Sequence, residues 1–297
     1  METSENKCYY VSSRGILKSC DIYNRNIGSS DTHLDLDTYL SIKHNDIVYV
    51  CNSAIPSFFK NIYPFIKERF ILVSGDSDVS MPFEGYETYV NDDKLIVWFS
   101  QNLTVNHPKL KHLPIGLDFH TISKINEMHP WGPSMLPIEQ DTLLMQVSQM
   151  AEPFESRLFG CYINFHFPHW GINTRGDRQE CLASIQKDLC YFEPEYLNRY
   201  DIWKKMGIFK FVLCPYGGGL DTHRLWEALI LGCIPIIKSS GLDALFEDLN
   251  VCIVSSWSDV NAKFLVKFLK NMKSRNKKKL TLEYWMEKIQ SYKDVTC

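Results

Sequence analysis

The sequence predicts an α/β fold of two Rossmann-like domains, each built on a parallel sheet, with the active site in the cleft between them. Residues 211–237 have the pattern of strand, glycine-rich loop, helix and strand, which is the β-α-β unit of open parallel sheets. Residues 46–74 repeat that order in the amino half. Because 297 residues suit two domains of ordinary size, we expect one domain at 1–150 and another at 151–297.

The carboxy-terminal unit has the clearest pattern. Residues 211–214 form an apolar run that fits a buried strand, and the Pro-Tyr-Gly-Gly-Gly sequence at 215–219 lets the backbone turn sharply. A helix follows, with Asp221 or Thr222 as its N-cap. Its helical spacing is carried by Leu225, Ala228, Leu229 and Gly232. Glycine ends the helix, and a second apolar strand comes next.

A glycine-rich loop that leads into the amino end of a helix offers backbone N–H groups and a positive dipole to an anion. The pattern therefore predicts a phosphate site, in which Arg224 and His223 add charge-assisted hydrogen bonds and Glu227 accepts from a ribose diol. The alternative interpretation is a tight turn before an ordinary capped helix. No Gly-Lys-Ser/Thr follows, so the loop is not a nucleoside-triphosphate P-loop. The candidate donor-binding residues are Gly217, Gly218, Gly219, Thr222, His223, Arg224, Glu227 and Arg178.

The segment CPYGGGLDTHRLWEALILGCIPI at 214–236 resembles the donor-binding signature of exostosin-like glycosyltransferases of the GT-B architecture. The resemblance is firm over 211–254 and looser elsewhere. It implies that Arg224 meets the donor diphosphate, that Glu227 meets the ribose, and that Gly217 to Gly219 allow the phosphates to approach closely.

Composition excludes several other classes of protein. The net charge is −3 with charges well mixed, so we expect no nucleic-acid partner. No apolar stretch is long enough for a membrane span, and the amino terminus lacks the apolar core of a signal peptide. The 10 cysteines include no Cys-x-x-Cys pair. A reducing compartment is therefore expected. Because animal members of the exostosin-like family are secretory, this departure from the family suggests a cytoplasmic protein from a microbe or a virus, in the latter case in the host cytoplasm.

In the amino half, apolar runs predict strands at 8–12, 46–51, 70–74 and 95–99, and helical spacing predicts helices at 34–42 and 54–69. Residues 13–32 are polar and irregular. The segments 98–102, 106–108 and 113–118 resemble, more loosely, the sequence at the end of the first domain in GT-B-like proteins.

Two carboxylates follow the strand at 70–74. Asp76 and Asp78 stand where parallel sheets place active-site groups, and three interpretations stay open: a metal clamp, a general base, or caps of the following turn. Direct displacement of a sugar requires a base that takes the proton of the acceptor hydroxyl. Asp78 is the first candidate, and Asp76 and Asp118 are the other candidates. Asp118, His107 and His120 are placed to face the cleft.

Residues 128–152 have weak periodicity and predict a linker or an acceptor-side loop region. Beyond them we expect a strand at 158–165, a loop at 166–174 and a helix at 175–187 that carries Arg178. The pair His166 and His169 lacks a third ligand, which makes zinc improbable. After the second β-α-β unit we expect a short helix at 242–249, a strand at 251–254 and an amphipathic helix at 259–272. A basic turn at 273–279 follows, and the last helix, at 282–292, is expected to cross back onto the first domain.

These patterns together predict a metal-independent glycosyltransferase that needs no cofactor besides its nucleotide-sugar donor. Its acceptor would be a hydroxyl of a glycan, a protein or a small molecule. Two alternatives stay open: a nucleotide- or glycan-binding protein that has lost the reaction, and a metal-dependent GT-A enzyme that uses Asp76 and Asp78. The sequence determines neither the donor base and sugar nor the stereochemical outcome.

Overall fold

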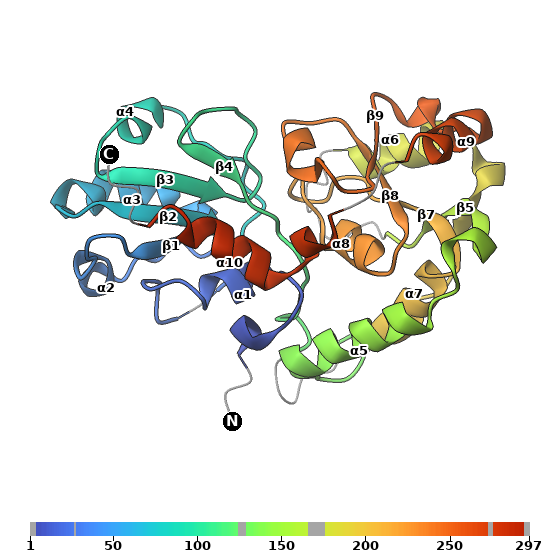
Figure 1. Cartoon of the computed structure of the whole chain (residues 1–297), viewed down its shortest axis with the longest axis horizontal. Coiled ribbons are helices and arrows are strands. Elements are labelled where there is room, and N and C mark those ends of the chain that lie inside the picture. The colour runs from blue at the N-terminus through green and yellow to red at the C-terminus, as the bar shows by residue number, and fades with distance from the viewer. Residues whose placement is uncertain (1–3, 27, 124–128, 166–175, 273–275, 294–297) are drawn as a thin grey trace.

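The structure is a computed structural model, which describes residues 4–26, 28–123, 129–165, 176–272 and 276–293. Figure 1 shows two lobes, each containing one sheet, with helix α8 between them. No helix in these ranges has the length and apolar character to cross a bilayer.

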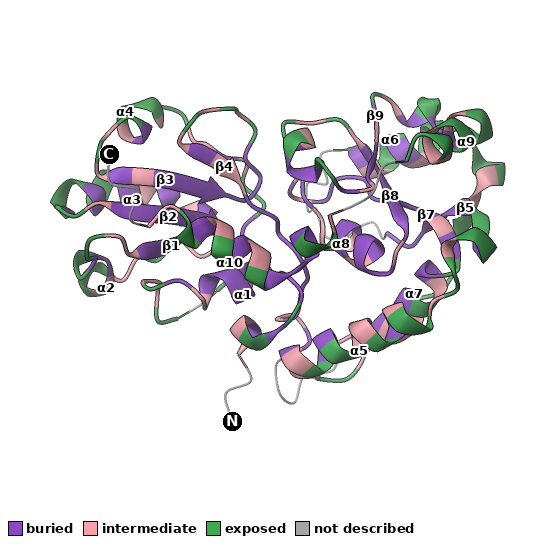
Figure 2. Ribbon diagram, in the orientation of Figure 1, coloured by how far each residue is buried: buried purple, intermediate pink, exposed green. Residues whose placement is uncertain are grey.

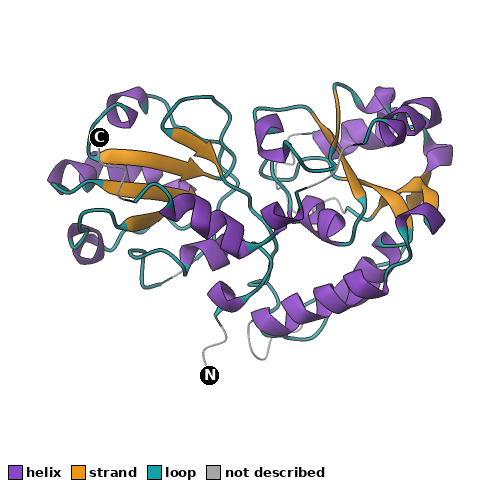
Figure 3. Ribbon diagram, in the orientation of Figure 1, coloured by secondary structure: helices purple, strands orange, loops and turns teal. Residues whose placement is uncertain are grey.

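The first sheet has four parallel strands in the order β1-β2-β3-β4. The strands are β1 (Ile47–Cys51), β2 (Phe70–Gly75), β3 (Leu95–Ser100) and β4 (Leu110–His112). Four short helices lie in the same part of the chain, namely α1 (Ser13–Leu17), α2 (Leu36–Leu40), α3 (Ile55–Asn61) and α4 (Glu87–Val90). Because the strands are parallel, their carboxyl ends meet at one edge of the sheet, which faces the second lobe (Figure 3).

The second sheet has five parallel strands in the order β6-β5-β7-β8-β9. The strands are β5 (Leu158–Ile163), β6 (Cys190–Phe192), β7 (Phe209–Leu213), β8 (Ile234–Lys238) and β9 (Cys252–Val254). Its helices are α5 (Pro137–Met150), α6 (Asp177–Ser184), α7 (Arg199–Met206), α8 (His223–Ile230) and α9 (Ala262–Lys270).

The central strands of both sheets are buried on both faces, as Figure 2 shows by the purple strands inside each lobe, whereas most of β6 and the start of β5 are exposed. Alternate residues of β2 point to opposite sides, with Ile71 and Val73 in one apolar cluster and Leu72 in another. In β7, Val212 and Leu213 likewise belong to different clusters. Sheets covered on both faces require near-continuous apolar strands, which is the pattern that the sequence has. The prediction of two Rossmann-like α/β domains is confirmed.

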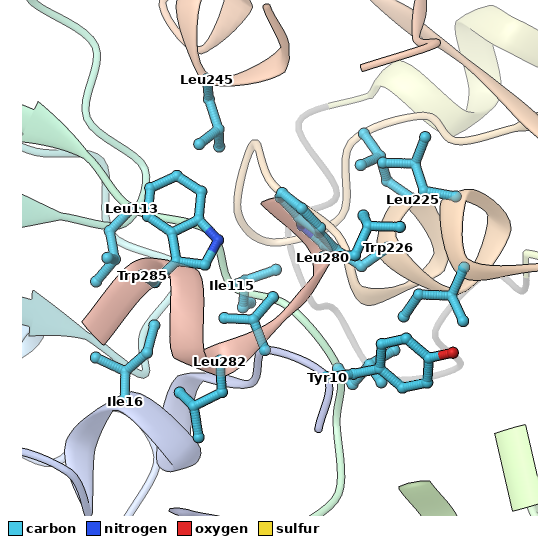
Figure 4. Packing of buried hydrophobic residues seen from close by; sticks show 14 of the residues in the cluster. Tyr10, Ile16, Leu113, Ile115, Leu225, Trp226, Leu245, Leu280, Leu282 and Trp285 are labelled. Carbon is cyan, nitrogen blue, oxygen red and sulfur yellow. The ribbon is translucent and has the colours of Figure 1, made fainter. Parts of the chain in front are cut away.

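The largest apolar cluster is shared by the two lobes (Figure 4). Trp285 of the last helix packs near Leu113 of the first lobe, and Trp226 of α8 packs beside Leu225 in the second. Leu280 lies between the two tryptophans. The lobes are therefore joined by a common core around the cleft, which restricts how the two halves of any site move apart.

Helix α10 (Leu282–Gln290) packs against α1 of the first lobe, as the sequence predicted for the last helix. The backbone N–H of Val11 donates to the carbonyl of Leu280 at 3.0 Å, and that of Leu282 donates to the carbonyl of Tyr9, also at 3.0 Å. The chain thus returns to its amino-terminal segment after completing the second sheet.

The predicted strand at 8–12 is wrong, and part of the segment expected to be irregular is helix α1. The N–H groups of Tyr9 and Tyr10 donate to the carboxylate of Asp141 at 2.8 and 3.1 Å instead of joining a strand. Ser12 then caps α1, because its hydroxyl accepts from the N–H of Gly15 at 3.0 Å.

The predicted helix at 54–69 ends early, and the predicted linker at 128–152 contains a helix. Helix α3 stops at Asn61, and a 3-10 turn at Tyr63–Phe65 that contains Pro64 follows it. Helix α5 has a weak apolar pattern because its buried face carries the polar residues Gln140 and Asp141 as well as Leu144 and Val147.

The elements that were not predicted include α4, β6 and α7. The helix predicted at 242–249 is the 3-10 turn Asp243–Phe246, and the one predicted at 259–272 is the shorter α9. The loop at 166–174 with His166 and His169 lies outside the described residues. Of the basic turn, residues 273–275 also lie outside them, and Lys277–Leu280 is a 3-10 turn.

Candidate functional site

A cavity of about 250 Å³ lies where β7 leads into α8. The glycine-rich loop, residues 217–219, forms one wall of the cavity. Asp78 and Ile115 line it from the loops that follow β2 and β4. Both domains therefore contribute to the cavity, at the carboxyl ends of their strands.

Helix α8 holds its functional side chains through the packing of its apolar face. Leu225, Trp226 and Leu229 are buried in the shared core, which turns His223, Arg224 and Glu227 toward the cavity. Thr222 is the N-cap by its extended backbone, and its side chain makes no capping hydrogen bond. Gly232 follows the helix with a φ of 79°, the left-handed conformation that glycine adopts without strain.

Arg224 is held rigidly at the start of α8. Its Nε donates to Oδ1 of Asn164 at 2.7 Å, and its guanidinium lies 5.7 Å from the ring centre of Phe165. Both partners follow strand β5, so the two neighbouring strand ends β5 and β7 orient one cation. Burial lowers the pKa of Arg224, which means that the charge has little water around it and favours an anionic ligand.

Arg178 brings a second cation to the glycine-rich loop. It lies on the first turn of α6, and its Nη2 would be 3.2 Å from a Cβ atom at Gly217, so the missing side chain permits its approach. Burial and the neighbouring charge of Arg224 lower the pKa of Arg178 to about 10. At neutral pH both guanidiniums are charged, and an anion between them would relieve their repulsion.

The other two glycines are in contact with the first domain. A Cβ atom at Gly218 would overlap the carboxylate of Asp78, and one at Gly219 would lie 3.0 Å from Nδ2 of Asn102. The carboxamide oxygen of Asn102 accepts from the N–H groups of Leu220 and Asp221 at 3.1 and 3.0 Å. Glycine is required here because the first domain packs directly on the loop.

His223 also contacts the first domain. Its Nδ1 lies 2.8 Å from the carbonyl oxygen of Gly116, which can only accept, so Nδ1 carries the proton. Glu227 stands one turn further along α8 and lines the same cavity. The structure therefore brings Gly217, Gly218, Gly219, Thr222, His223, Arg224, Glu227 and Arg178 together, the whole set of predicted donor-binding residues.

Arg199, Trp131 and Trp203 also line the cavity and were not predicted. The guanidinium of Arg199 lies 4.7 Å from the ring centre of Trp131 and 5.6 Å from that of Trp203. Its Nη1 donates to the carbonyl of Asp118 at 2.6 Å and to the side chain of Gln140. No local signal marks Arg199, because its partners come from distant parts of the chain.

Asp76 and Asp78 face different surroundings. The Asp76 carboxylate is buried, with Oδ2 at 3.5 Å from Nε of Arg14 and Oδ1 at 3.3 Å from the hydroxyl of Ser29. Burial raises the pKa of Asp76, opposed mainly by the charge of Arg14. Asp78 is exposed and stands against the glycine-rich loop.

Asp118 lies after β4 and pairs with His120, whose Nδ1 is 3.2 Å from Oδ1 of Asp118. Its two oxygens also accept from Thr121, at 3.0 Å from the N–H and 2.7 Å from the hydroxyl. Burial would raise the pKa of Asp118, but the charges of His223, His120 and Arg199 outweigh it and hold that pKa well below its ordinary value. His107, by contrast, accepts from the N–H of Lys109 at 3.1 Å, which is a local turn contact.

Within the ranges given above, no three His, Cys, Asp or Glu side chains are grouped so that they could hold a metal ion. Asp76 and Asp78, for which a metal clamp was one of three interpretations, direct their carboxylates at Arg14 and at Gly218 respectively.

No family model matches this chain. Solved structures with a similar course of the chain include an α1,3-fucosyltransferase, with 11% identity and a TM-score of 0.36 over 85% of this chain and 83% of that chain. The N-terminal domain of Candida albicans trehalose-6-phosphate phosphatase has 13% identity and a TM-score of 0.37, and the match covers 86% of this chain and 71% of that chain. The GtfA/B complex has 13% identity and a TM-score of 0.35, and the match covers 85% of this chain and 57% of that chain. Likeness at this level does not bear on function, which we argue from the site.

Proposed function

We propose that this protein is a glycosyltransferase that binds a nucleotide-sugar donor on its second domain and transfers the sugar to a hydroxyl acceptor held by its first domain. The observation that carries the proposal is the meeting of a glycine-rich loop, the amino end of α8 and the guanidiniums of Arg178 and Arg224 at one cavity. Two cations and a helix amino terminus suit a diphosphate, which is the leaving group of such donors.

The same groups can stabilise the diphosphate as it leaves the sugar. When the bond between the sugar and the diphosphate breaks, negative charge grows on the phosphate oxygens. Arg178 and Arg224 are already oriented and partly desolvated, so they stabilise this charge without reorganising. We therefore propose that transfer needs no metal ion. Glu227, one turn along α8, is placed to accept hydrogen bonds from a ribose diol.

The acceptor side of the cleft belongs to the first domain. The loops after β2 and β4 reach the glycine-rich loop through Asp78 and Ile115, so an acceptor that meets the donor must lie along these strand ends. A base on this side would take the proton of the acceptor hydroxyl. The resemblance to exostosin-like enzymes agrees with this division of roles, since it places the donor on the carboxy-terminal domain.

The proposal is tested by calorimetry with UDP, GDP and ADP, first on the wild-type protein and then on the Arg224→Ala variant. We expect one of the three diphosphates to bind, and Arg224→Ala to weaken that binding about 10- to 100-fold, since a charge-assisted hydrogen bond contributes ~1.5–3 kcal/mol.

The matched control is Arg25→Ala, which removes a guanidinium of the first domain whose side chain is 82% exposed and does not line the cavity. It should bind the diphosphate as the wild type does. Binding that is equally tight in Arg224→Ala would show that the cavity is not the diphosphate site. Binding of none of the three by the wild type would refute the proposed function.

A further inference from the structure

A chain of three polar side chains, Asp118, His120 and Ser29, runs along the edge of the first domain. Nδ1 of His120 lies 3.2 Å from Oδ1 of Asp118, and Nε2 lies 3.3 Å from the hydroxyl of Ser29. Asp118 is buried and Ser29 is exposed, while the side chain of His120 is 20% exposed. The imidazole therefore connects an inner carboxylate with an exposed hydroxyl.

The surroundings of Asp118 fix the proton on His120. Both carboxylate oxygens accept hydrogen bonds from Thr121, and the pKa of Asp118 is held well below its ordinary value, so the carboxyl is ionised at neutral pH. An ionised carboxylate can only accept, so Nδ1 of His120 must be the donor. Nε2 is then left with a lone pair that faces outward, toward Ser29, which is the tautomer that a general base requires.

The pair lies beside the donor cavity. Gly116, two residues before Asp118, accepts the hydrogen bond from Nδ1 of His223 at 2.8 Å, and His223 lines the cavity. Arg199 lines it too and donates to the carbonyl of Asp118. The segment that carries Asp118 and His120 is thus attached at two points to the residues around the proposed diphosphate site.

We propose that His120 is the general base of the transfer reaction, that Asp118 positions it, and that the acceptor hydroxyl binds at Nε2 where the Ser29 hydroxyl now lies. This inference rests on the proposed function. In the step, the acceptor O–H bond breaks and its proton goes to Nε2 of His120. The acceptor oxygen forms a bond to the anomeric carbon, and the bond from that carbon to the diphosphate breaks with its electron pair leaving on the diphosphate.

The other carboxylates of this edge are less suited to the task. Asp76 contacts the same Ser29 hydroxyl, but its carboxylate is buried and its other oxygen faces Arg14, which donates to Ser29 at 3.1 Å. The Ser29 hydroxyl has a single proton, which it gives either to Asp76 or to Nε2 of His120, so an acceptor hydroxyl can take its place at Nε2. Asp78 belongs to the first domain, but its carboxylate lies against Gly218 of the proposed diphosphate loop, so a base there would meet the leaving group before the acceptor.

Four ionisable groups act on His120: Asp118, Arg14, Asp76 and His223. Burial lowers the pKa of His120, and although Asp118 and Asp76 raise it, the imidazole stays neutral at physiological pH. A neutral imidazole is the form that accepts a proton. Turnover should therefore fall on the acidic side of neutrality as His120 becomes protonated.

The first test measures sugar transfer with a panel of UDP- and GDP-sugars and p-nitrophenyl glycosides as acceptors. We expect His120→Gln to lower turnover by about 10² to 10⁴ with unchanged affinity for the diphosphate, and added imidazole to restore part of the turnover of His120→Gly. Asp118→Asn should lower turnover and shift the acidic limb of the pH profile, which a purely structural residue would not do. His44→Gln, an exposed histidine of the first domain, is the control that should keep full turnover.

Full turnover in His120→Gln would overturn the inference and leave the proposed function intact. A loss in Ser29→Ala as large as that in His120→Gln would also overturn it, because Ser29 would then be the nucleophile of a different reaction. Absence of diphosphate binding to the wild type is the separate result that refutes the proposed function.

A second test needs no substrate. In a long-range ¹H–¹⁵N spectrum of the histidine side chains, His120 of the wild-type protein should be the tautomer protonated at Nδ1, and Asp118→Asn should lose that preference. A proton on Nε2 of His120 at neutral pH would overturn the assignment of the base.

Discussion

The carboxylate of Asp221 accepts a hydrogen bond from the backbone N–H of Ile115 at 2.8 Å, across the boundary between the two sheets. The same carboxylate accepts from the indole N–H of Trp226 at 2.9 Å and from the N–H of Thr222. One fully buried side chain thus joins the start of α8 to the strand ends of the first domain. Its protonation state is therefore linked to the stability of the cleft.

The first prediction concerns the pH dependence of stability. Burial raises the pKa of Asp221 to about 6, while its N–H partners oppose that rise. In the unfolded chain the pKa is 3.8, so between about pH 4 and pH 6 the folded protein binds a proton that the unfolded chain lacks. The contribution of Asp221 to the free energy of unfolding should then fall with rising pH, by up to about 3 kcal/mol, and stay level above pH ~6.

Urea unfolding of the wild type and of Asp221→Asn at several pH values from about 4 to 7 measures this effect, because asparagine does not titrate. The stability of the wild type relative to the variant should decrease across that range. A difference that is constant with pH would show that Asp221 is ionised throughout and that its N–H partners dominate.

The second prediction concerns Asn102, which accepts hydrogen bonds from Leu220 and Asp221 and donates to the carbonyl of Ser77 at 3.1 Å. Asn102→Ala should lower the free energy of unfolding by about 2 to 4 kcal/mol, since two N–H groups lose their acceptor. Asn102→Asp keeps the acceptor and should cost less. Urea unfolding gives both values, with the exposed Asn106→Ala as the control. Equal losses in the Ala and Asp variants would mean that the acceptor role is unimportant.

The second β-α-β unit was predictable because its signals are local. Apolar runs mark β7 and β8, helical spacing marks α8, and Gly232 ends that helix with its positive φ. The direction of Arg224 and Glu227 then follows from which face of α8 is apolar. Such patterns depend on neighbours within one or two turns, so one sequence is enough to read them.

The contacts that complete the site were not predictable in this way. Asn102 meets Leu220 across 118 positions, and Arg199 meets Asp118 across 81. Asp78 was ranked first as the base from its place after a strand, but a strand end does not reveal whether a carboxylate faces donor or acceptor. The pairing of His120 with Asp118 is local, but it depends on the backbone conformation of the loop after β4, which apolar periodicity does not predict.

The third prediction is that transfer persists in excess EDTA, because Arg178 and Arg224 supply the positive charge that a metal ion provides elsewhere. The measurement is turnover, or donor hydrolysis, before and after chelation. Loss of activity that added Mn²⁺ restores would support a metal role, and Asp76 and Asp78 would be the first residues to substitute.

The last prediction separates the donor side from the acceptor side through Asp78. Its carboxylate stands over Gly218, and its charge acts on Arg178, so it occupies part of the space in which a diphosphate would bind. Asp78→Asn removes a like charge from that space and should tighten diphosphate binding about two- to fivefold, the size expected of an exposed charge pair. Turnover should be largely kept, because His120 remains. Calorimetry and a transfer assay measure the two quantities, with the exposed Glu84→Gln as the control. If turnover instead falls by about 10² to 10⁴ while diphosphate affinity is unchanged, Asp78 is the base, as the sequence first indicated, and the assignment to His120 is wrong.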